Sequence, residues 1–303
     1  MMDRRTLLIG SAAASFAAVT ARAEPEQQVI VFGPEAPFSF DALTGKAKEL
    51  SQRPYQKPAV PDFDLLERLD FDAYQQIKFR PELAIWGHGD GPYPIELFHL
   101  GRYFKEPVRI YAVSPQGTAR EVLYSPNLFT YGKSGFAKTL PPDAGFAGFR
   151  VLNAPGEPDW LAFLGASYFR SPAETGQYGL SSRGLAIDVA MPTPEEFPRF
   201  TGFWLEPLAG KRGIVVNALL DSPRIAGALR METVRETGTL MNIEARLFPR
   251  ADIARVGIAP LTSMFWYAKH NRRTASDWRP EIHDSDGLSI WTGAGERIWR
   301  PIN

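Results

Sequence analysis

The feature that most constrains the fold is the alternation of short apolar runs, rich in β-branched and aromatic residues, with breaks at glycine and proline. The chain of 303 residues contains 26 glycines and 26 prolines, spread along its length. Short runs bounded by turn residues are typical of β-strands. Many strands with few helices favour a β-sandwich or a β-barrel. We expect strands at 29–32, 108–113, 184–190, 214–220 and 241–247.

Few segments have a helical pattern. We expect helices at 38–50 and 62–74 and a third, short one at 251–255. Residues 46–60, with their Arg, Lys and Pro content, are interpreted as a surface loop after the first helix. No repeat and no Ser/Gly-rich linker divides the chain, so we expect one domain.

The composition excludes several classes of function. Lys and Arg together number 34, as do Asp and Glu, so the formal net charge is zero. Because a nucleic-acid-binding protein normally carries a basic run or patch, we expect no nucleic-acid partner. The chain has no cysteine, which excludes disulfides, thiolate metal sites and cysteine nucleophiles. His88 and His99 lack the close spacing of a zinc pair, so we expect neither a metal nor a cofactor.

The N-terminus predicts export. Arg4 and Arg5 precede an alanine-rich apolar run at 7–19, and Ala21-Arg22-Ala23 is a small-residue cleavage pattern. Paired arginines favour a twin-arginine signal. A membrane anchor is the alternative, but the run is shorter than the roughly 20 residues that span a bilayer. We therefore expect a cleaved signal at 1–23 and a periplasmic mature chain, 24–303, without a membrane span.

One polar segment, 279–288, is the strongest candidate for a catalytic site. It places Arg279, Glu281, His283 and Asp284 in ten residues, and Trp278 and Trp291 flank it. Indole rings stack on the apolar faces of sugar rings, and a carboxylic acid can protonate a glycosidic oxygen. The segment therefore predicts a carbohydrate site. The alternative is a plain turn, because Asp-Ser-Asp-Gly is a turn-forming string, and it lacks the later ligands of a calcium loop.

This segment and four others resemble the periplasmic glucan biosynthesis family MdoG/OpgG/OpgD. The resemblance runs from about residue 29 to the last residue, and Trp266-Tyr267 and the paired arginines are closer to the OpgD branch. Members of the family are longer. They have a large, galactose-mutarotase-like β-sandwich followed by an immunoglobulin-like domain, which implies that this chain ends inside the sandwich. The matching strings lie at 163–170, 178–188, 195–198, 259–267 and 279–288.

The resemblance implies that the protein acts on β-1,2-linked glucan. Some members are similar to inverting β-1,2-glucanases, and Asp284 occupies the position of their general acid. Two alternatives stay open: a glucan-binding protein without strong catalysis, and a structural partner of a membrane glucosyltransferase.

The base that must accompany the acid has no clear sequence signature. Asp188 is the most conspicuous acidic group in the 178–188 string, with Glu195 and Glu196 downstream, yet each could equally cap a turn. Glu281 and His283 could assist catalysis or bind substrate. Arg279 and Glu281 could pair with each other or bind hydroxyl groups. Asp286 is interpreted as a turn residue.

Aromatic and arginine side chains in the family-like strings are candidates for carbohydrate binding, because glucan grooves need exposed rings. Core packing is the rival interpretation for each ring, and we favour it for Trp204, which lies between Phe203 and Leu205. The candidates are Tyr168, Arg170, Arg183, Trp266, Tyr267, Trp278, Arg279 and Trp291.

Overall fold

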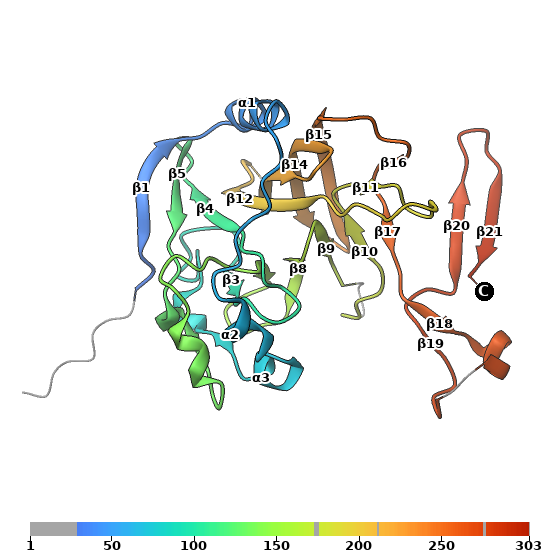
Figure 1. Ribbon diagram of the computed structural model, residues 1–303, viewed down its shortest axis with the longest axis horizontal. Helices are drawn as coiled ribbons and strands as arrows, with labels where there is room; N and C mark the ends of the chain where they lie inside the picture. Colours follow the sequence, from blue (N-terminus) through green and yellow to red (C-terminus); the bar gives the residue numbers. More distant parts are fainter. Residues whose placement is uncertain (1–28, 173–175, 211, 275–276, 303) are drawn as a thin grey trace, which may run out of the picture.

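The computed structural model describes residues 29–172, 176–210, 212–274 and 277–302, and shows a mainly β protein built on two sheets (Figure 1). The predicted export signal at 1–23 lies outside the described residues. In the larger sheet seven strands follow the order β1-β5-β4-β12-β13-β14-β15. Their bounds are β1 (Phe32–Pro37), β4 (Arg109–Val113), β5 (Thr118–Val122), β12 (Arg199–Pro207), β13 (Gly213–Asp221), β14 (Ile225–Arg235) and β15 (Thr239–Pro249).

The second sheet has six strands in the order β17-β10-β9-β8-β7-β3. All its pairs are antiparallel. In the larger sheet β4 and β12 run parallel, and the other pairs are antiparallel. The strands of the second sheet are β3 (Ile95–Phe98), β7 (Gly148–Leu152), β8 (Asp159–Leu164), β9 (Tyr168–Arg170), β10 (Ser181–Arg183) and β17 (Leu261–Thr262).

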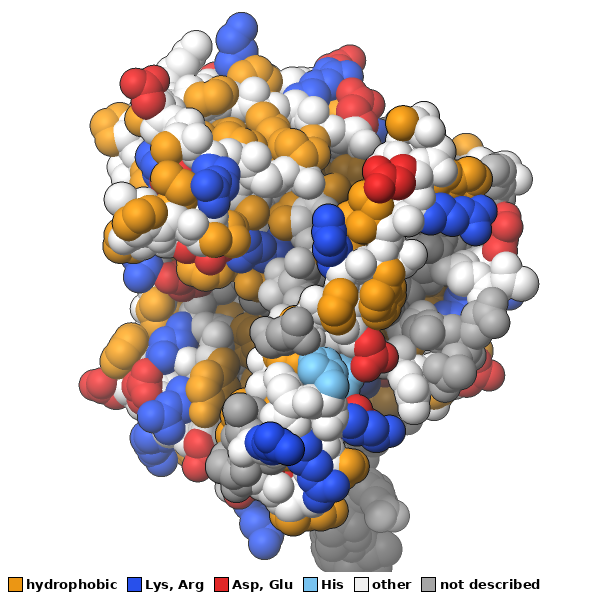
Figure 2. All heavy atoms as spheres, turned by 90° about the vertical axis from the view of Figure 1, so that its right-hand side faces the viewer, with side chains coloured by type: hydrophobic (Ala, Val, Ile, Leu, Met, Phe, Trp, Pro, Cys, Tyr) orange, Lys and Arg blue, Asp and Glu red, His pale blue; other side chains and the backbone are white. Residues whose placement is uncertain are grey.

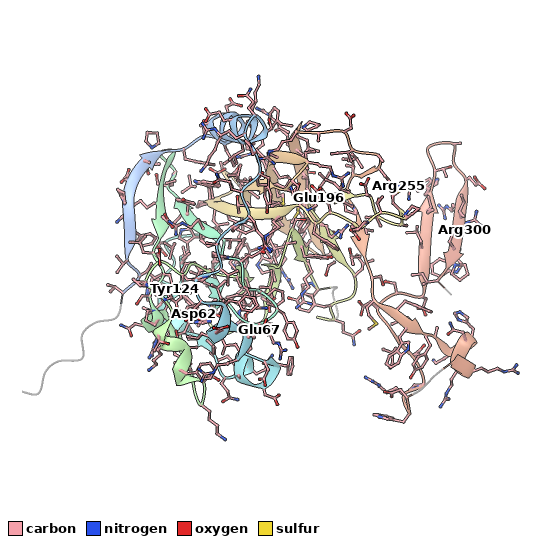
Figure 3. All side chains as sticks on the ribbon, in the orientation of Figure 1. Asp62, Glu67, Tyr124, Glu196, Arg255 and Arg300 are labelled. Atoms are coloured by element: carbon pink, nitrogen blue, oxygen red, sulfur yellow. The ribbon has the colours of Figure 1, made fainter. Side chains whose placement is uncertain are left out.

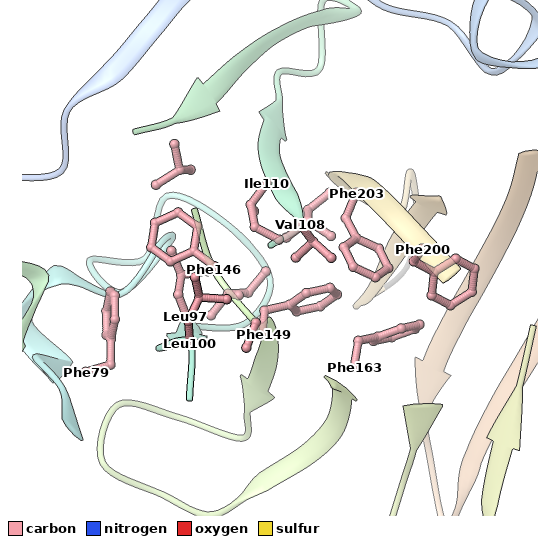
Figure 4. Packing of buried hydrophobic residues seen from close by; sticks show 14 of the residues in the cluster. Phe79, Leu97, Leu100, Val108, Ile110, Phe146, Phe149, Phe163, Phe200 and Phe203 are labelled. Carbon is pink, nitrogen blue, oxygen red and sulfur yellow. The ribbon is translucent and has the colours of Figure 1, made fainter. Parts of the chain in front are cut away.

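Phenylalanine rings fill the space between the two sheets (Figure 4). Phe149 and Phe163 from the six-stranded sheet stack with centroids 4.9 Å apart, and both meet Phe203 of β12, at 5.1 and 5.4 Å. Phe200 of β12 adds a fourth buried ring. Each such burial is worth roughly 1.5–3 kcal/mol. The two sheets therefore form the predicted sandwich.

Helix α1 (Phe40–Ser51) covers the outer face of the seven-stranded sheet. Ser39 caps its first turn by accepting a hydrogen bond from the Ala42 backbone nitrogen at 3.1 Å. Its buried side chains, Leu43 and Ala47, are four residues apart and so share one helix face. Under the helix lies Trp204, 8 % exposed and stacked between aromatic neighbours, which confirms its predicted core position.

Three predicted elements differ from those in the structure. The helix at 62–74 is two short helices, α2 (Phe63–Glu67) and α3 (Phe71–Gln75), because Asp70 caps the second one by accepting from the Ala73 nitrogen at 2.9 Å. No helix forms at 251–255. The predicted loop at 46–60 begins only after Ser51, where α1 ends.

Two predicted strands are also shorter or shifted. At 184–190 only β11 (Ala186–Ile187) forms, paired with β16 (Val256–Gly257), because the backbone of Asp188 and Ala190 has positive φ. The strand expected at 29–32 starts at Phe32. The predictions at 108–113, 214–220 and 241–247 are confirmed as β4, β13 and β15.

The C-terminal part forms two small antiparallel pairs beside the sandwich (Figure 1). They are β18 (Phe265–Tyr267) with β19 (Ile282–His283), and β20 (Gly287–Trp291) with β21 (Arg297–Pro301). Among the described residues, every helix is too short or too polar to cross a bilayer. The remaining elements are β2 (Lys78–Phe79), β6 (Phe129–Thr130) and the 3₁₀ helices Pro81–Leu83, Pro126–Leu128, Gly135–Thr139 and Lys269–Thr274.

Candidate functional site

A cavity of about 690 Å³ lies on the outer face of the six-stranded sheet. Side chains alternate across a strand, so Phe163 points into the sandwich while its neighbours Ala162 and Leu164 line the cavity. On the next strands Tyr168, Arg170 and Ser181 line it too. Two of the predicted carbohydrate-binding residues, Tyr168 and Arg170, are therefore brought together in one cavity.

The facing wall of the cavity comes from segments distant in sequence. It is formed by Lys57, Val60, Phe63 and the stretch from Arg102 to Glu106. The rings of Phe63 and Tyr103 are 56 % and 70 % exposed, which leaves faces free for stacking. Neither ring was predicted as a binding residue, because the sequence around each of them has no motif of a binding site.

Arg183 is buried next to Tyr168, which lines the cavity. It is 6 % exposed, and its Nη2 donates to Glu195 Oε1 at 2.6 Å. Its Nη1 lies 3.4 Å from the Tyr168 hydroxyl, and its guanidinium lies over the rings of Tyr168 and Phe197. Because these neighbours enclose it, Arg183 is placed to position Tyr168 rather than to reach a ligand itself.

Asp188 is enclosed in an ion-pair network. It is 4 % exposed, and its Oδ2 lies 2.6 Å from Arg224 Nη1 while its Oδ1 accepts from the Arg255 backbone nitrogen at 3.0 Å. Arg224 also binds Glu196 at 2.7 Å, and Figure 3 shows where Glu196 and Arg255 lie. The hydrogen bond from Arg224 lowers the pKa of Asp188. These contacts favour the turn-forming interpretation of Asp188 and of Glu196.

Asp284 is exposed at the end of β19. Its Oδ2 accepts from the Met264 backbone nitrogen at 3.0 Å, and its own nitrogen donates to the Met264 carbonyl at 2.8 Å. The loop also reaches the segment before β10, since a Cβ placed on Gly179 would lie 3.7 Å from the Asp284 carbonyl oxygen. Ser181, two residues further, lines the cavity. The loop of Asp284 therefore contacts the segment that leads into β10, and Asp284 itself is not among the described residues that line the cavity.

His283 stands beside Asp284 but faces another group of side chains. Its side chain is 8 % exposed, and its Nε2 lies 2.9 Å from Asp286 Oδ1 and 3.9 Å from Glu281 Oε2. The hydrogen bond to Asp286 raises the pKa of His283. Glu281 is also paired with Lys269 at 3.3 Å. One ligand atom from each of Glu281, His283 and Asp286 lies within 4.8 Å of the others, a spacing that could hold a cation.

Arg279 is not paired with Glu281, which corrects one of the two alternatives offered for it. Its guanidinium binds Asp277 in a bidentate pair at 2.9 and 2.7 Å. This contact lowers the pKa of Asp277 to about 2. Asp277 was not predicted as a partner, because the sequence does not fix the local backbone conformation that brings the side chains of Asp277 and Arg279 together.

The remaining aromatic candidates divide into one buried ring and three exposed ones. Tyr267 is fully buried, and its hydroxyl donates to the Arg279 carbonyl at 2.9 Å, so its ring has no free face for a sugar. Trp266, Trp278 and Trp291 are 53 %, 85 % and 73 % exposed.

On the face shown in Figure 2, apolar, basic and acidic side chains are interspersed, without a broad surface of one charge.

The chain is similar to one family model and to several curated proteins. Residues 38–303 match the family model described as "Periplasmic glucan biosynthesis protein, MdoG". Glucans biosynthesis protein D 2 of Ralstonia nicotianae is 44 % identical over 100 % of this chain and 59 % of its own length. Glucans biosynthesis protein D of Xanthomonas oryzae pv. oryzae is 46 % identical over 99 % of this chain and 58 % of its own.

A third relative, glucans biosynthesis protein D of Stenotrophomonas maltophilia, is 50 % identical over 89 % of this chain and 51 % of its own length. The chain thus spans between half and three fifths of the length of these curated relatives. Both the matching strings and the β-sandwich agree with this relationship, and the chain belongs to the periplasmic glucan biosynthesis protein family MdoG.

Proposed function

We propose that this protein binds β-1,2-linked glucan in the periplasm, along the cavity on the six-stranded sheet, and hydrolyses it with Asp284 as the general acid. The observation that carries the proposal is the position of the exposed Asp284 loop against the segment that leads into β10, whose Ser181 lines a 690 Å³ cavity. The cavity offers Tyr168, Phe63 and Tyr103 as rings for glucose units.

The proposed chemistry needs a proton on the Asp284 carboxyl group. This proton passes to the glycosidic oxygen as the bond to the anomeric carbon breaks, and a water molecule attacks that carbon from the opposite face. A base takes the proton of this water, directly or through a second water molecule. Asp188 is a poor candidate for the base, because both of its oxygens are engaged by Arg224 and Arg255.

The backbone around Asp284 suits an acid that must stay in place. Only Oδ2 accepts from Met264, so the contacts described leave Oδ1 available to face a substrate oxygen. The neighbouring His283 is held by Asp286 and by the Tyr267 carbonyl, at 2.9 and 3.3 Å. We assign His283 and Glu281 to supporting this loop and contacting sugar hydroxyls.

The experiment follows the release of reducing ends from linear β-1,2-glucan by the wild-type protein and by Asp284→Asn. Asparagine keeps an oxygen that accepts from Met264, so the loop is preserved while the acid is lost. We expect the rate to fall by about 100-fold or more, the contribution of a general acid. Asp252→Asn is the matched control, because this carboxylate is exposed and lies outside both the cavity lining and the 279–288 segment, and it should retain most activity. Equal rates for Asp284→Asn and wild type would remove the acid assignment.

A second candidate function is a glucan-binding partner of a membrane glucosyltransferase without catalysis of its own. The hairpin β20–β21 favours it, because Trp291 and Trp299 are 73 % and 56 % exposed. Trp299 pairs with Ser289, two residues before Trp291, so both indole rings lie on the same face of the hairpin and offer an apolar surface to a partner. Glucan binding without any release of reducing ends, by wild type as by Asp284→Asn, would support this candidate over hydrolysis.

A further inference from the structure

Cations outnumber carboxylates around the cavity on the six-stranded sheet. Among the residues that the structure describes, five basic side chains line it, and Glu106 is the one carboxylate in the same lining. The basic residues are Lys57, Arg102, Lys105, Arg170 and Arg199. Since the whole chain has a formal net charge of zero, this local excess is not a general property of the protein.

Each acidic neighbour is shared by two cations. Glu106 lies 3.3 Å from the Lys57 ammonium group and also contacts the Arg199 guanidinium. Glu67, just outside the lining, lies 3.2 Å from Arg102. The same Glu67 lies 2.6 Å from the Lys105 ammonium group. Two carboxylates therefore balance four cations only in part, and two positive charges remain.

Arg170 adds a third positive charge from the floor of the cavity. It is exposed, and its guanidinium lies over the Tyr178 ring at 4.5 Å. Among the described residues no carboxylate lies within ion-pair distance of it. Asp159 accepts a hydrogen bond from the Tyr178 hydroxyl and does not line the cavity. Even with Asp159 counted, the described side chains around the cavity have two more positive than negative charges.

A neutral sugar chain needs rings and hydrogen-bonding groups, and it does not need a net charge. Uncompensated cations in a partly enclosed cavity instead raise the local concentration of an anion. Guanidinium groups bind carboxylates and phosphates through charge-assisted hydrogen bonds. The rings of Phe63 and Tyr103 line the same cavity as these cations. A ligand that matches both kinds of group has a sugar ring and a negative charge.

We propose that the cavity selects glucan bearing an anionic substituent, a carboxylate half-ester or a phosphate ester on a glucose hydroxyl. This inference rests on the proposed function in placing glucan in the cavity, and it adds the charge of the ligand. The Lys105 ammonium group, 5.0 Å from the centroid of the Phe63 ring, marks where a stacked glucose would bring its substituent.

The test measures dissociation constants by calorimetry for three short β-1,2-gluco-oligosaccharides: unmodified, carrying succinyl half-esters, and carrying phosphate esters. We expect both anionic probes to bind about tenfold more tightly than the neutral one at low salt, equivalent to one good charge-assisted contact. The advantage should shrink as the salt concentration rises. The preferred probe identifies the substituent.

Charge-removing variants locate the effect. Lys57→Gln combined with Arg102→Gln removes two of the five cations in the lining and should bring the ratio of the neutral to the anionic dissociation constant down towards one, whatever the change in neutral binding. Lys133→Gln is the matched control, because this lysine is exposed and does not line the cavity. Circular dichroism verifies that each variant is folded. A preference that survives the double substitution would overturn the assignment to this cavity.

The outcomes separate this inference from the proposed function. If the neutral oligosaccharide binds as tightly as the anionic ones, the inference is wrong and the proposed function stands. If only the anionic probes bind, the inference holds and the view that plain glucan is the ligand fails. Vesicles of phosphatidylglycerol form a further arm: binding to them in preference to every oligosaccharide would assign the cations to a lipid surface and overturn the inference.

Discussion

His99 makes the stability of this protein depend on pH in a way that one substitution can isolate. The residue is 2 % exposed at the end of β3. Its Nδ1 donates to the Leu100 carbonyl at 2.6 Å, which leaves Nε2 as acceptor for the Tyr124 hydroxyl at 3.2 Å. Phe129 packs edge-on against the ring, with centroids 5.0 Å apart. The surroundings therefore suit a neutral imidazole.

Burial lowers the pKa of His99 from 6.5 to about 4. Between these two values the unfolded chain binds a proton that the folded chain does not, so stability decreases as pH falls below about 6.5. The linkage relation gives a loss of about 2 kcal/mol between pH 7.5 and pH 5, and about 3 kcal/mol in full below pH 4. Above pH 7 the residue contributes no pH dependence.

The assay is urea unfolding followed by tryptophan fluorescence at pH 7.5 and pH 5, for wild type and for His99→Gln. Glutamine cannot take up a proton, so the difference in unfolding free energy between the two proteins should shift by about 2 kcal/mol over this interval. Taking the difference cancels the other titrating groups. A difference that is the same at both pH values would refute the reasoning, whatever the absolute stability of the variant.

Three further predictions test the packing. Gly148→Ala places a Cβ 2.0 Å from the Phe163 carbonyl oxygen and should cost about 3 kcal/mol or more in urea unfolding; Gly135→Ala, with open space around the new carbon, should differ little from wild type. Asp188→Asn leaves Arg224 paired with Glu196 alone and should lower Tm at neutral pH. Because the pKa of Asp188 is lowered in the folded state, the difference in Tm from wild type should narrow as pH falls below about 4, and an unchanged Tm at pH 7 would contradict its structural role. Ser39→Ala removes the cap of α1 and should cost about 1 kcal/mol, which equal unfolding midpoints would contradict.

Elements whose sequence pattern is uninterrupted were predictable. The run at 214–220, apolar except for Asn217, became β13, which is buried along its whole length, because a strand buried on both faces is apolar at nearly every position. The segment at 184–190 has a similar composition and failed as a strand. Its backbone is turned by the ion pair of Asp188 with Arg224, and a contact across 36 positions leaves no local pattern.

The candidate site also has one part that the local sequence predicts and one part that depends on contacts between distant segments. The segment 279–288 is conspicuous through its own residues, whereas the cavity combines β8–β10 with Lys57 and with Arg102 to Glu106, which only the fold brings together. Trp266 and Tyr267 show a finer limit. They are adjacent in β18, so they face opposite sides, and the sequence does not say which ring is buried.

The parallel pairing of β4 with β12 has a consequence for how the chain acquires its structure. Gly202 pairs with Arg109, about 90 residues away, and the strands β7 to β10 of the other sheet lie between them in the sequence. Such distant pairings slow folding. The hairpins from β12 to β15 join consecutive strands and can form on their own timescale of microseconds. Folding is therefore expected to start in this meander and to wait for the N-terminal strands to dock, so the slow step is the closure of the sheet at its centre.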